Sequence, residues 1–295
     1  MPSSSTTDPG PAVSVVTVCR NAAATLEACI ASVAGQSYAP VEHIVIDGAS
    51  TDATPAILER HRDHLALVVS EPDSGLYDAM NKGVARATGT FVIFMNADDL
   101  FAGPHALRDA MAEIARQPDG DVYYGALEIR GAGAPFVHVP PPPDQAAAEM
   151  VLGCLPHQAT LARREVFART GPFDLRWRRH ADYDWWLKVL CDPSIRLRQI
   201  PTVIASFAMG GASSDLAKGQ PEVFAIQNAS PLYRSPEWDR RRIEMFQGAW
   251  LSERMEAARL REGGAGGPGW KARIARHLPP GMLRALQALR RRLGG

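Results

Sequence analysis

Residues 90–99 of this 295-residue chain read TFVIFMNADD, an apolar run that ends in two adjacent carboxylates. A run from Thr90 to Met95 without any charged side chain is typical of a strand that is covered on both faces. Such strands occur mainly in parallel sheets with helices packed on either side. The segment therefore predicts a buried parallel strand with Asp98 and Asp99 at its carboxyl end.

The segments around this strand alternate between strand and helix patterns. β-Branched runs predict strands, and apolar residues at spacings of three and four predict helices. Thr54 before Pro55 is typical of a helix start. The expected strands are 13–19, 43–46, 65–69, 90–95 and 121–129, and the expected helices are 26–33, 54–58, 76–87 and 104–116. This alternation predicts an α/β fold with a Rossmann-like, mostly parallel sheet flanked by helices.

Polar groups follow the ends of these expected strands. In parallel sheets ligands bind beyond the carboxyl ends, so these groups should converge on one crevice. They are Arg20-Asn21, Asp47, Asp73 and Asn96-Ala97-Asp98-Asp99. No GxGxxG follows a strand and no GxxxxGK[ST] occurs. The sequence therefore argues against a dinucleotide-dependent dehydrogenase and a P-loop NTPase.

The polar groups each allow two interpretations. The pair Asp98 and Asp99 suits Mg²⁺ or Mn²⁺ shared with phosphate oxygens, or else caps the helix that follows Pro104. Asp47 and Asp73 accept hydrogen bonds from a nucleotide, or else stabilise local turns. Similarly, the basic side chains face a pyrophosphate or only solvent, and these are Arg20 and Lys82.

The order of the motifs favours the functional interpretation. A strand ending in CRN, a strand ending in DGAST-D, then PDSGLYDAMNKG, NADD, LPHQATLARREVF and GPFD…ADYDWWLK follow one another between residues 12 and 214. This series resembles the family 2 glycosyltransferases with the GT-A fold, and most closely those that make bacterial polysaccharides of the colanic-acid type. The resemblance implies a GT-A fold with a helical C-terminal extension.

The resemblance also implies roles for residues of the crevice. Asp47 reads the base, Asp98 holds the metal on the diphosphate with Asp99 sharing that role, and Asn96 replaces the first acid of the usual DxD motif. The base is most often uracil in such enzymes, and guanine and thymine stay open. The expected nucleotide-sugar residues are Thr17, Cys19, Arg20, Asn21, Asp47, Asp73, Lys82, Asn96, Ala97 and Asp98.

The acidic motif at 181–184 contains the expected catalytic base. If residues 181–190 are helical, Tyr183 and Trp186 belong to a buried stripe, and Asp182 and Asp184 cannot face the same cleft. Asp184 has Lys188 four residues on, which suits an ion pair. Asp182 shares its side with Trp185, which is expected to form an apolar wall for a sugar and to raise the pKa of the acid. The family pattern also places the base at Asp182; the alternative is that Asp182 caps the helix.

The resemblance implies one displacement with inversion, from a nucleoside-diphosphate sugar to a hydroxyl of a glycan or a lipid-linked acceptor in cell-surface polysaccharide biosynthesis. His157 is expected on the acceptor side, with a structural role as the alternative. Gly210-Gly211 resembles a family loop near the pyrophosphate or is a plain turn. The competing hypothesis is a catalytically inactive GT-A module that binds a nucleotide sugar or a partner protein. A nucleotidyltransferase is disfavoured because no loop rich in glycine, arginine and lysine follows the first strand.

Composition constrains the setting of the protein. Lys plus Arg and Asp plus Glu are both 32, which argues against a nucleic-acid partner. Four scattered cysteines and the lack of a signal peptide or an apolar span predict a cytoplasmic protein. The expected parts are a disordered N-terminus (1–11), a GT-A domain (12–230), a helical extension (231–262), a glycine-rich hinge (263–270) and a basic amphipathic tail (271–295). The tail is expected to contact the inner face of the cell membrane, or else to pack on protein.

Overall fold

The computed structural model of the chain describes residues 10–131, 134–209 and 216–262. The chain divides into two units, Met1–Ser235 and Pro236–Gly295, and each is considered by itself. The expected hinge, the tail and Gly210-Gly211 lie outside the described residues, as do residues 1–9 of the expected N-terminal segment.

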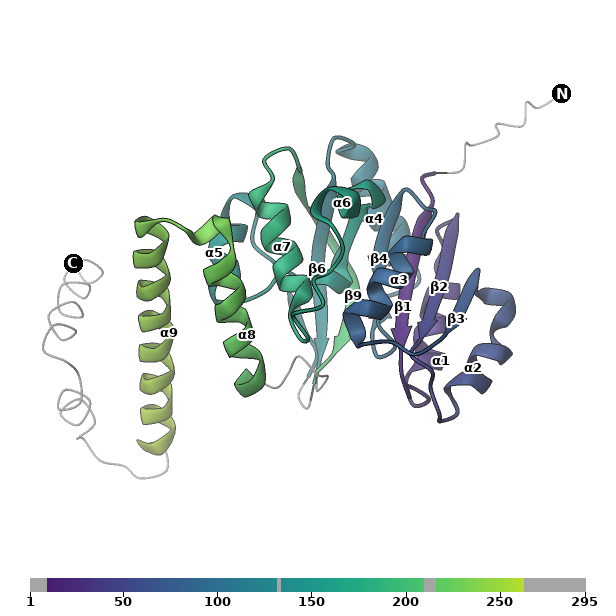
Figure 1. Ribbon diagram of the computed structural model, residues 1–295, viewed down its shortest axis with the longest axis horizontal. Helices are drawn as coiled ribbons and strands as arrows, with labels where there is room; N and C mark the ends of the chain where they lie inside the picture. The colour runs from purple at the N-terminus through teal and green to yellow at the C-terminus, as the bar shows by residue number, and fades with distance from the viewer. Residues whose placement is uncertain (1–9, 132–133, 210–215, 263–295) are drawn as a thin grey trace, which may run out of the picture. The chain divides into compact units, whose positions relative to one another are not determined.

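Nine strands of the described residues form one sheet in the first unit (Figure 1). The strands are β1 (Val13–Cys19), β2 (Val41–Asp47), β3 (Leu67–Ser70), β4 (Phe91–Phe94), β5 (Leu100–Phe101), β6 (Val122–Arg130), β7 (Phe136–His138), β8 (Thr160–Arg163) and β9 (Leu197–Ala208). Their order is β3-β2-β1-β4-β8-β6-β9-β5, and β7 pairs with β6 beside this path.

The first half of the sheet is parallel, as the sequence predicts. β1 pairs with β2 and β4, and β2 pairs with β3, all in parallel, so their carboxyl ends meet at one edge. The second half is mixed. β8 enters between β4 and β6 and is antiparallel to both, while β6 and β9 are parallel. The sequence pattern did not reveal β8, because this four-residue strand, TLAR, is too short to show a periodic pattern.

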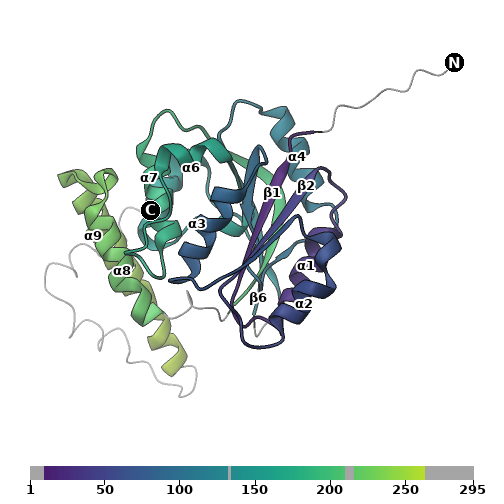
Figure 2. The same ribbon diagram turned by 45° about the vertical axis from the view of Figure 1, so that its right-hand side comes forward.

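Helices cover both faces of this sheet. They are α1 (Leu26–Ala34), α2 (Thr54–Arg60), α3 (Leu76–Arg86), α4 (Ala106–Arg116), α5 (Ala146–Leu152), α6 (Arg164–Thr170), α7 (Ala181–Cys191) and α8 (Leu216–Ala229). α1 and α4 pack with odd-numbered residues of β1 and β4. α3 lies against β1 and β2 on the opposite face (Figure 2). The expected strands and helices of residues 13–129 are all present, with ends that differ by at most two residues.

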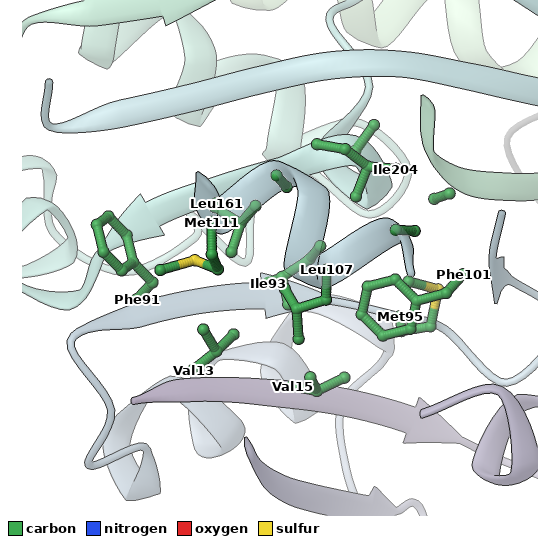
Figure 3. Close-up of a cluster of buried hydrophobic side chains, with 14 of the residues drawn as sticks. Val13, Val15, Phe91, Ile93, Met95, Phe101, Leu107, Met111, Leu161 and Ile204 are labelled. Atoms are coloured by element: carbon green, nitrogen blue, oxygen red, sulfur yellow. The ribbon is translucent and has the colours of Figure 1, made fainter. Parts of the chain in front are cut away.

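One core cluster of the described residues lies between the sheet and the helices α1 and α4. Its side chains come from β1, β4, β5, β8, β9, α4 and the residue after β4, as Figure 3 shows for Val13, Val15, Phe91, Ile93, Met95, Phe101, Leu107, Met111, Leu161 and Ile204. The cluster lies directly beneath the strand that ends in NADD. The acid pair therefore lies in the short connection between β4 and β5, beside this core.

The second unit contains one long helix among its described residues, α9 (Pro236–Glu262). Trp238 and Trp250 each carry an arginine over the ring, from Arg241 and Arg254 at 4.9 Å from the centroid. Within the described part of the chain, no helix combines the length and the apolar character that crossing a membrane requires.

Candidate active site

The loops that follow β1, β2 and β3 meet at the carboxyl edge of the parallel strands. Gly48 lies so close to the Asp73 carboxylate that a methyl group on Gly48 would overlap it, and the Arg20 side chain is within 3.4 Å of the same point. Arg20, Asp47-Gly48 and Asp73 therefore form one surface, as the sequence predicts. The close approach requires glycine at position 48.

Asn21 joins the first two of these loops. Its backbone has a positive φ of 51°, which asparagine tolerates better than most residues. Its backbone N–H donates to Ser50 (2.7 Å), and its side-chain oxygen accepts from the backbone N–H of Thr51 (2.8 Å). Asn21 thus holds the shape of the loops.

Asp47 is fully buried at the end of β2. Its carboxylate accepts hydrogen bonds from the backbone N–H and the hydroxyl of Ser50 and from the hydroxyl of Ser70 (2.6 Å). A cavity of about 190 Å³ opens beside it. The cavity is lined by Asp47, Pro55, Leu58, Glu59, Arg62, Val68 and Ser70.

Thr17 and Cys19 lie beneath this surface. Thr17 is fully buried, and its hydroxyl is 3.0 Å from Nε2 of His43. Cys19 is 7% exposed, and burial together with the charge of Asp47 raises the pKa of its thiol. The structure therefore places Thr17 in the core, where its side chain supports the pocket instead of lining it.

Lys82 makes its contacts with its own neighbourhood. Its ammonium group lies 3.0 Å from Glu71 and 3.5 Å from Asp78, and it donates to the carbonyl of Pro72 (2.9 Å). These contacts hold the segment that leads to Asp73. In the structure Lys82 therefore acts on the loop that carries the predicted binding residue.

The acid pair does not cap a helix. α4 begins at Ala106 with His105 at its N-cap, and β5 separates that helix from Asp99. Asp99 is fully buried, and neither of its carboxylate oxygens makes a well-formed hydrogen bond. Burial and the charge of Asp98 raise the pKa of Asp99 to about 7. A buried carboxylate without partners is costly unless a cation neutralises it.

These oxygens fit a divalent cation. The Oδ1 atom of Asn96 is also buried without a partner, so two neighbouring side chains offer free oxygens. Mg²⁺ and Mn²⁺ prefer one or two carboxylates and take their remaining ligands from phosphate and water. The described residues contain no group of three or more acidic, histidine or cysteine side chains arranged to hold a metal. Such an ion would therefore depend on ligands from a bound diphosphate.

Asp182 is the second residue of α7, and two side chains from other parts of the chain hold its carboxylate in place. The Tyr77 hydroxyl donates to Oδ1 (2.5 Å), and Nδ1 of His157 lies 3.0 Å from Oδ2. The helix N-cap, His180, makes no side-chain capping bond, and Asp182 makes its contacts elsewhere. The structure thus gives no support to the capping alternative.

The pKa of Asp182 is shifted in the direction opposite to the one expected. Burial acts to raise it, but the hydrogen bond and charge of His157 and the Tyr77 hydroxyl hold it below the ordinary value of 3.8. The predicted rise beside Trp185 is therefore wrong, and Asp182 is ionised at neutral pH. For His157, burial lowers the pKa, but the bond to Asp182 and the charges of Asp182, Asp99 and Asp98 raise it above 6.5. His157 thus couples the expected base to the acid pair.

The sequence matches the family model described as Glycosyl transferase family 2 over residues 14–187, more than half of the chain. The chain belongs to glycosyl transferase family 2. It is 32% identical over 214 residues to a PGL/p-HBAD biosynthesis glycosyltransferase of Mycobacterium bovis, covering 70% of this chain and 80% of that protein. It is 29% identical over 188 residues to the putative teichuronic acid biosynthesis glycosyltransferase TuaG of Bacillus subtilis, covering 61% of this chain and 72% of that protein.

Solved structures of similar fold are glycosyltransferases as well. The mannosyltransferase PcManGT of Pyrobaculum calidifontis, in complex with GDP-Man and Mn²⁺, has a TM-score of 0.64 and 23% identity, covering 95% of this chain and 82% of that chain. S. aureus TarS 1-349 with UDP-GlcNAc has a TM-score of 0.60 and 19% identity, covering 79% and 71%. In a longer TarS chain the match spans 40% of that chain. The expected GT-A fold is confirmed.

Trp185 of this glycosyltransferase is not an acceptor wall. The ring is 3% exposed and stacks on Phe167 at 5.1 Å between centroids, and its N–H donates to the hydroxyl of Thr170 (2.9 Å). α7 is buried on two sides, so the side of the helix that carries Trp185 packs on α6 instead of facing a cleft. The prediction for Trp185 is therefore corrected.

Asp184 behaves as the sequence predicts. Its carboxylate lies 2.7 Å from the ammonium group of Lys188, four residues on in α7. The two side chains are 17% and 36% exposed. This ion pair leaves Asp182 as the acid of the motif that is joined to the rest of the site.

Three residues of the site were missed by sequence reasoning. Tyr77 bonds to Asp182, and Asn81 pairs through its amide with the backbone of Phe173 (2.8 and 2.9 Å). Both belong to α3 and dock PDSGLYDAMNKG onto GPFD…ADYDWWLK. Arg130 donates to the carbonyl of Asp98 (3.3 Å). The signal for Tyr77 and Asn81 was present in the motif, but the motif alone does not show what they contact.

Proposed function

We propose that this glycosyltransferase moves a sugar, with inversion, from a nucleoside-diphosphate sugar to a hydroxyl of a glycan or lipid-linked acceptor, with a divalent metal ion. The observation that carries the proposal is the environment of Asp182. The carboxylate is ionised, 13% exposed and fixed at both oxygens. A fixed, ionised carboxylate that solvent can still reach suits the removal of an acceptor proton.

A single displacement with inversion is part of our proposal, and it needs one base, for which Asp182 is the candidate. In a single displacement, the acceptor oxygen bonds to the anomeric carbon as the bond to the diphosphate breaks. The acceptor proton passes to a free lone pair of Asp182, because the Tyr77 and His157 bonds occupy only one lone pair on each oxygen. Tyr77 and His157 direct the carboxylate during this transfer.

Asp98 and Asp99 are the residues that would hold Mg²⁺ or Mn²⁺. A bound ion stabilises the negative charge that develops on the leaving diphosphate. The chain itself contributes the unpartnered oxygens of Asp99, and Arg130 fixes the backbone of Asp98. Both acids lie in the short connection between β4 and β5, beside the close-packed core.

The cavity beside Asp47 is our proposed site for the nucleobase. Apolar side chains of Pro55, Leu58 and Val68 suit the faces of a planar ring, and Arg62 and Ser70 suit its polar edge. Arg20 and Asp73 lie beside it on the path to the acid pair. We propose a UDP-sugar first, and the GDP-Man complex of PcManGT makes guanine the next base to test.

The names of the relatives support a role in cell-surface polysaccharide biosynthesis, since they refer to teichuronic acid and to PGL/p-HBAD biosynthesis. We propose that residues 12–230 form the catalytic domain. We also propose that the protein acts in the cytoplasm and that the segment 271–295 contacts anionic lipid at the inner face of the membrane.

A panel of nucleotide sugars tests the function. Purified protein is incubated with each UDP-, GDP- and dTDP-sugar, with Mn²⁺ or with excess chelator, and released nucleoside diphosphate is measured. We expect slow release from one group of donors, dependent on Mn²⁺, and faster release when an acceptor glycan is added. Nucleotide binding without release from any donor would instead support the inactive GT-A module.

Asp98→Ala tests the metal site. The side chain is half-buried at a strand end, so the variant should fold, whereas turnover should fall by roughly 10²- to 10³-fold as for other losses of one electrostatic stabiliser. Asp109→Ala, on the exposed pair with Arg108, is the matched control and should keep full activity. Near-normal turnover of Asp98→Ala, or of the wild type in excess chelator, would contradict the metal assignment.

A further inference from the structure

The segment that leads into α7 is held through its backbone by side chains of two other helices. On α3, the Tyr77 hydroxyl lies 2.8 Å from the Arg179 carbonyl. On α8, the Glu222 carboxylate accepts from the backbone N–H groups of Arg179 (3.0 Å) and His180 (3.2 Å). The backbone of Arg179 is therefore contacted from α8 at its N–H and from α3 at its carbonyl.

This segment matters because Asp182 lies in the first turn of α7, directly after it. The first N–H groups of a helix have no partner within the helix and need acceptors from elsewhere. In a capping box, an acid at the third helical residue accepts from the N–H of the N-cap residue. In α7 the third residue is Tyr183, and the N-cap residue, His180, makes no side-chain capping bond. Glu222 supplies the missing carboxylate from 42 residues away along the chain.

The close approach of α8 to the start of α7 makes this contact feasible (Figure 1). Gly219 of α8 faces the His180 ring, and a methyl group on Gly219 would come within 2.6 Å of Cε1. The other end of α8 has an anchor of its own, because the buried Gln227 donates to the Tyr183 hydroxyl (2.8 Å). We therefore expect α8 to stay in place when the Glu222 contact alone is removed.

We propose that Glu222 is a positioning residue for Asp182 and acts through the backbone at the start of α7. The inference rests on the proposed function of Asp182 as the base. Without the Glu222 acceptor, the first turn of α7 opens more often, and the Asp182 carboxylate is then misplaced. A misplacement of about 1 Å in a reacting group can lower a rate by about 10²-fold.

Glu222→Gln and Glu222→Met form the matched pair that tests this role. Glutamine keeps an acceptor oxygen at the same reach, whereas methionine has nearly the same length, forms helices well and has no comparable acceptor. We expect kcat to fall by about 10- to 100-fold in Glu222→Met and to stay within about threefold of the wild type in Glu222→Gln. KM for the donor should change little in both, because the proposed donor site is built from the loops after β1 to β4. Gln220→Ala, at an exposed residue of the same helix, is the control and should match the wild type.

Hydrogen exchange supplies a readout that needs no turnover. An amide that donates to Glu222 exchanges only when the contact opens, so its rate reports how often the helix start is free. In Glu222→Met the amides of Arg179, His180 and the first turn of α7 should exchange faster, and in Glu222→Gln they should stay near the wild-type rates. The amides of α4 should be unchanged in both variants, whereas a general loss of stability would increase exchange there as well.

Two results would overturn the inference. The first is faster exchange at the start of α7 in Glu222→Met together with normal kcat, because the base would then not depend on this anchor. The second is an equal loss of kcat in Glu222→Gln and Glu222→Met with unchanged exchange, because the charge of Glu222 would then matter instead of its contact. If Glu222→Met does not fold, Glu222→Asp replaces it. Aspartate keeps the charge but is one methylene shorter, so faster exchange and lower kcat are expected, and faster exchange with normal kcat overturns the inference.

The two proposals can fail separately. A wild type that releases no nucleoside diphosphate from any donor refutes the proposed function, and exchange at the start of α7 in Glu222→Met still reports whether Glu222 holds this segment. An active wild type whose Glu222→Met variant keeps its kcat rejects the inference alone.

Discussion

Comparing Asp182→Asn with Asp184→Asn separates the contribution of the acidic motif to catalysis from its contribution to the stability of the protein. The two residues share α7 and are two positions apart. Asp182 contacts Tyr77 and His157, whereas Asp184 contacts Lys188. The asparagine side chain has nearly the shape of aspartate but cannot accept the acceptor's proton.

The expected loss at Asp182 follows from the value of a positioned base. Such a base contributes roughly 10²–10⁴ in rate, which is about 2.7 to 5.4 kcal/mol of transition-state free energy. The amide can still accept from Tyr77, so donor binding and folding should be retained. Its other side presents N–H to Nδ1 of His157 and adds misorientation to the loss of the base.

The expected loss at Asp184 concerns folding. A helical ion pair at this spacing contributes about 0.3 to 0.5 kcal/mol, and an acid in the first turn of a helix contributes about 0.3 to 1 kcal/mol. Asp184→Asn should therefore lower the free energy of unfolding by about 1 kcal/mol. Its turnover should stay near that of the wild type.

Three measurements on each variant decide the matter: unfolding in urea, donor affinity by calorimetry with Mn²⁺, and turnover with donor and acceptor. The reasoning predicts intact donor binding in both and a loss of kcat in Asp182→Asn. If Asp182→Asn keeps more than about one-tenth of wild-type kcat, the value expected of a base is absent and the assignment fails. A selective loss of kcat in Asp184→Asn would move the base to that residue.

Two other predictions concern the structure around the site. Burial lowers the pKa of His43 to about 4, so between pH 6.5 and 4 the unfolded chain binds a proton that the folded chain does not, and stability should fall by roughly 3 kcal/mol over that range. His43→Gln should flatten this dependence in urea unfolding at pH 7 and 4.5; an unchanged slope would contradict it. Trp185→Ala should cost about 3–5 kcal/mol of stability and Trp185→Phe less. If Trp185→Phe is stable but binds the acceptor more weakly, Trp185 contacts the acceptor after all and our correction is wrong.

The fold of residues 13–129 could be predicted because each element there satisfies a local rule. TFVIFM has the composition of a strand buried on both sides, and Thr54-Pro55 has the chemistry of a helix start. The position of β8 could not be predicted in the same way. The neighbours of a strand depend on which edge of the sheet is free when that part of the chain joins it. The four residues of Thr160–Arg163 alone do not indicate which strands they pair with.

The site could be predicted in part. Arg20, Asp47 and Asp73 were expected at one edge because parallel strands end together, and the structure brings them together. The surroundings of Asp182 could not be predicted from the sequence, because its partners are 25 and 105 residues away along the chain. The sequence analysis assumed that only one face of α7 is buried. Its second buried face was therefore not predicted, and Trp185 was assigned to the cleft.

The lowered pKa of Asp182 has a consequence for how such a base works. A lower pKa makes a carboxylate a weaker base, and burial alone would have given a stronger one. Burial alone would also let part of the population carry a proton near neutral pH, and a protonated acid can remove none. The contacts with His157 and Tyr77 thus make Asp182 a weaker base but keep its carboxylate ionised and in a fixed orientation. This combination suits a reaction in which the acceptor hydroxyl becomes acidic only as it bonds to the sugar, because the proton then needs a fixed acceptor more than a strong one.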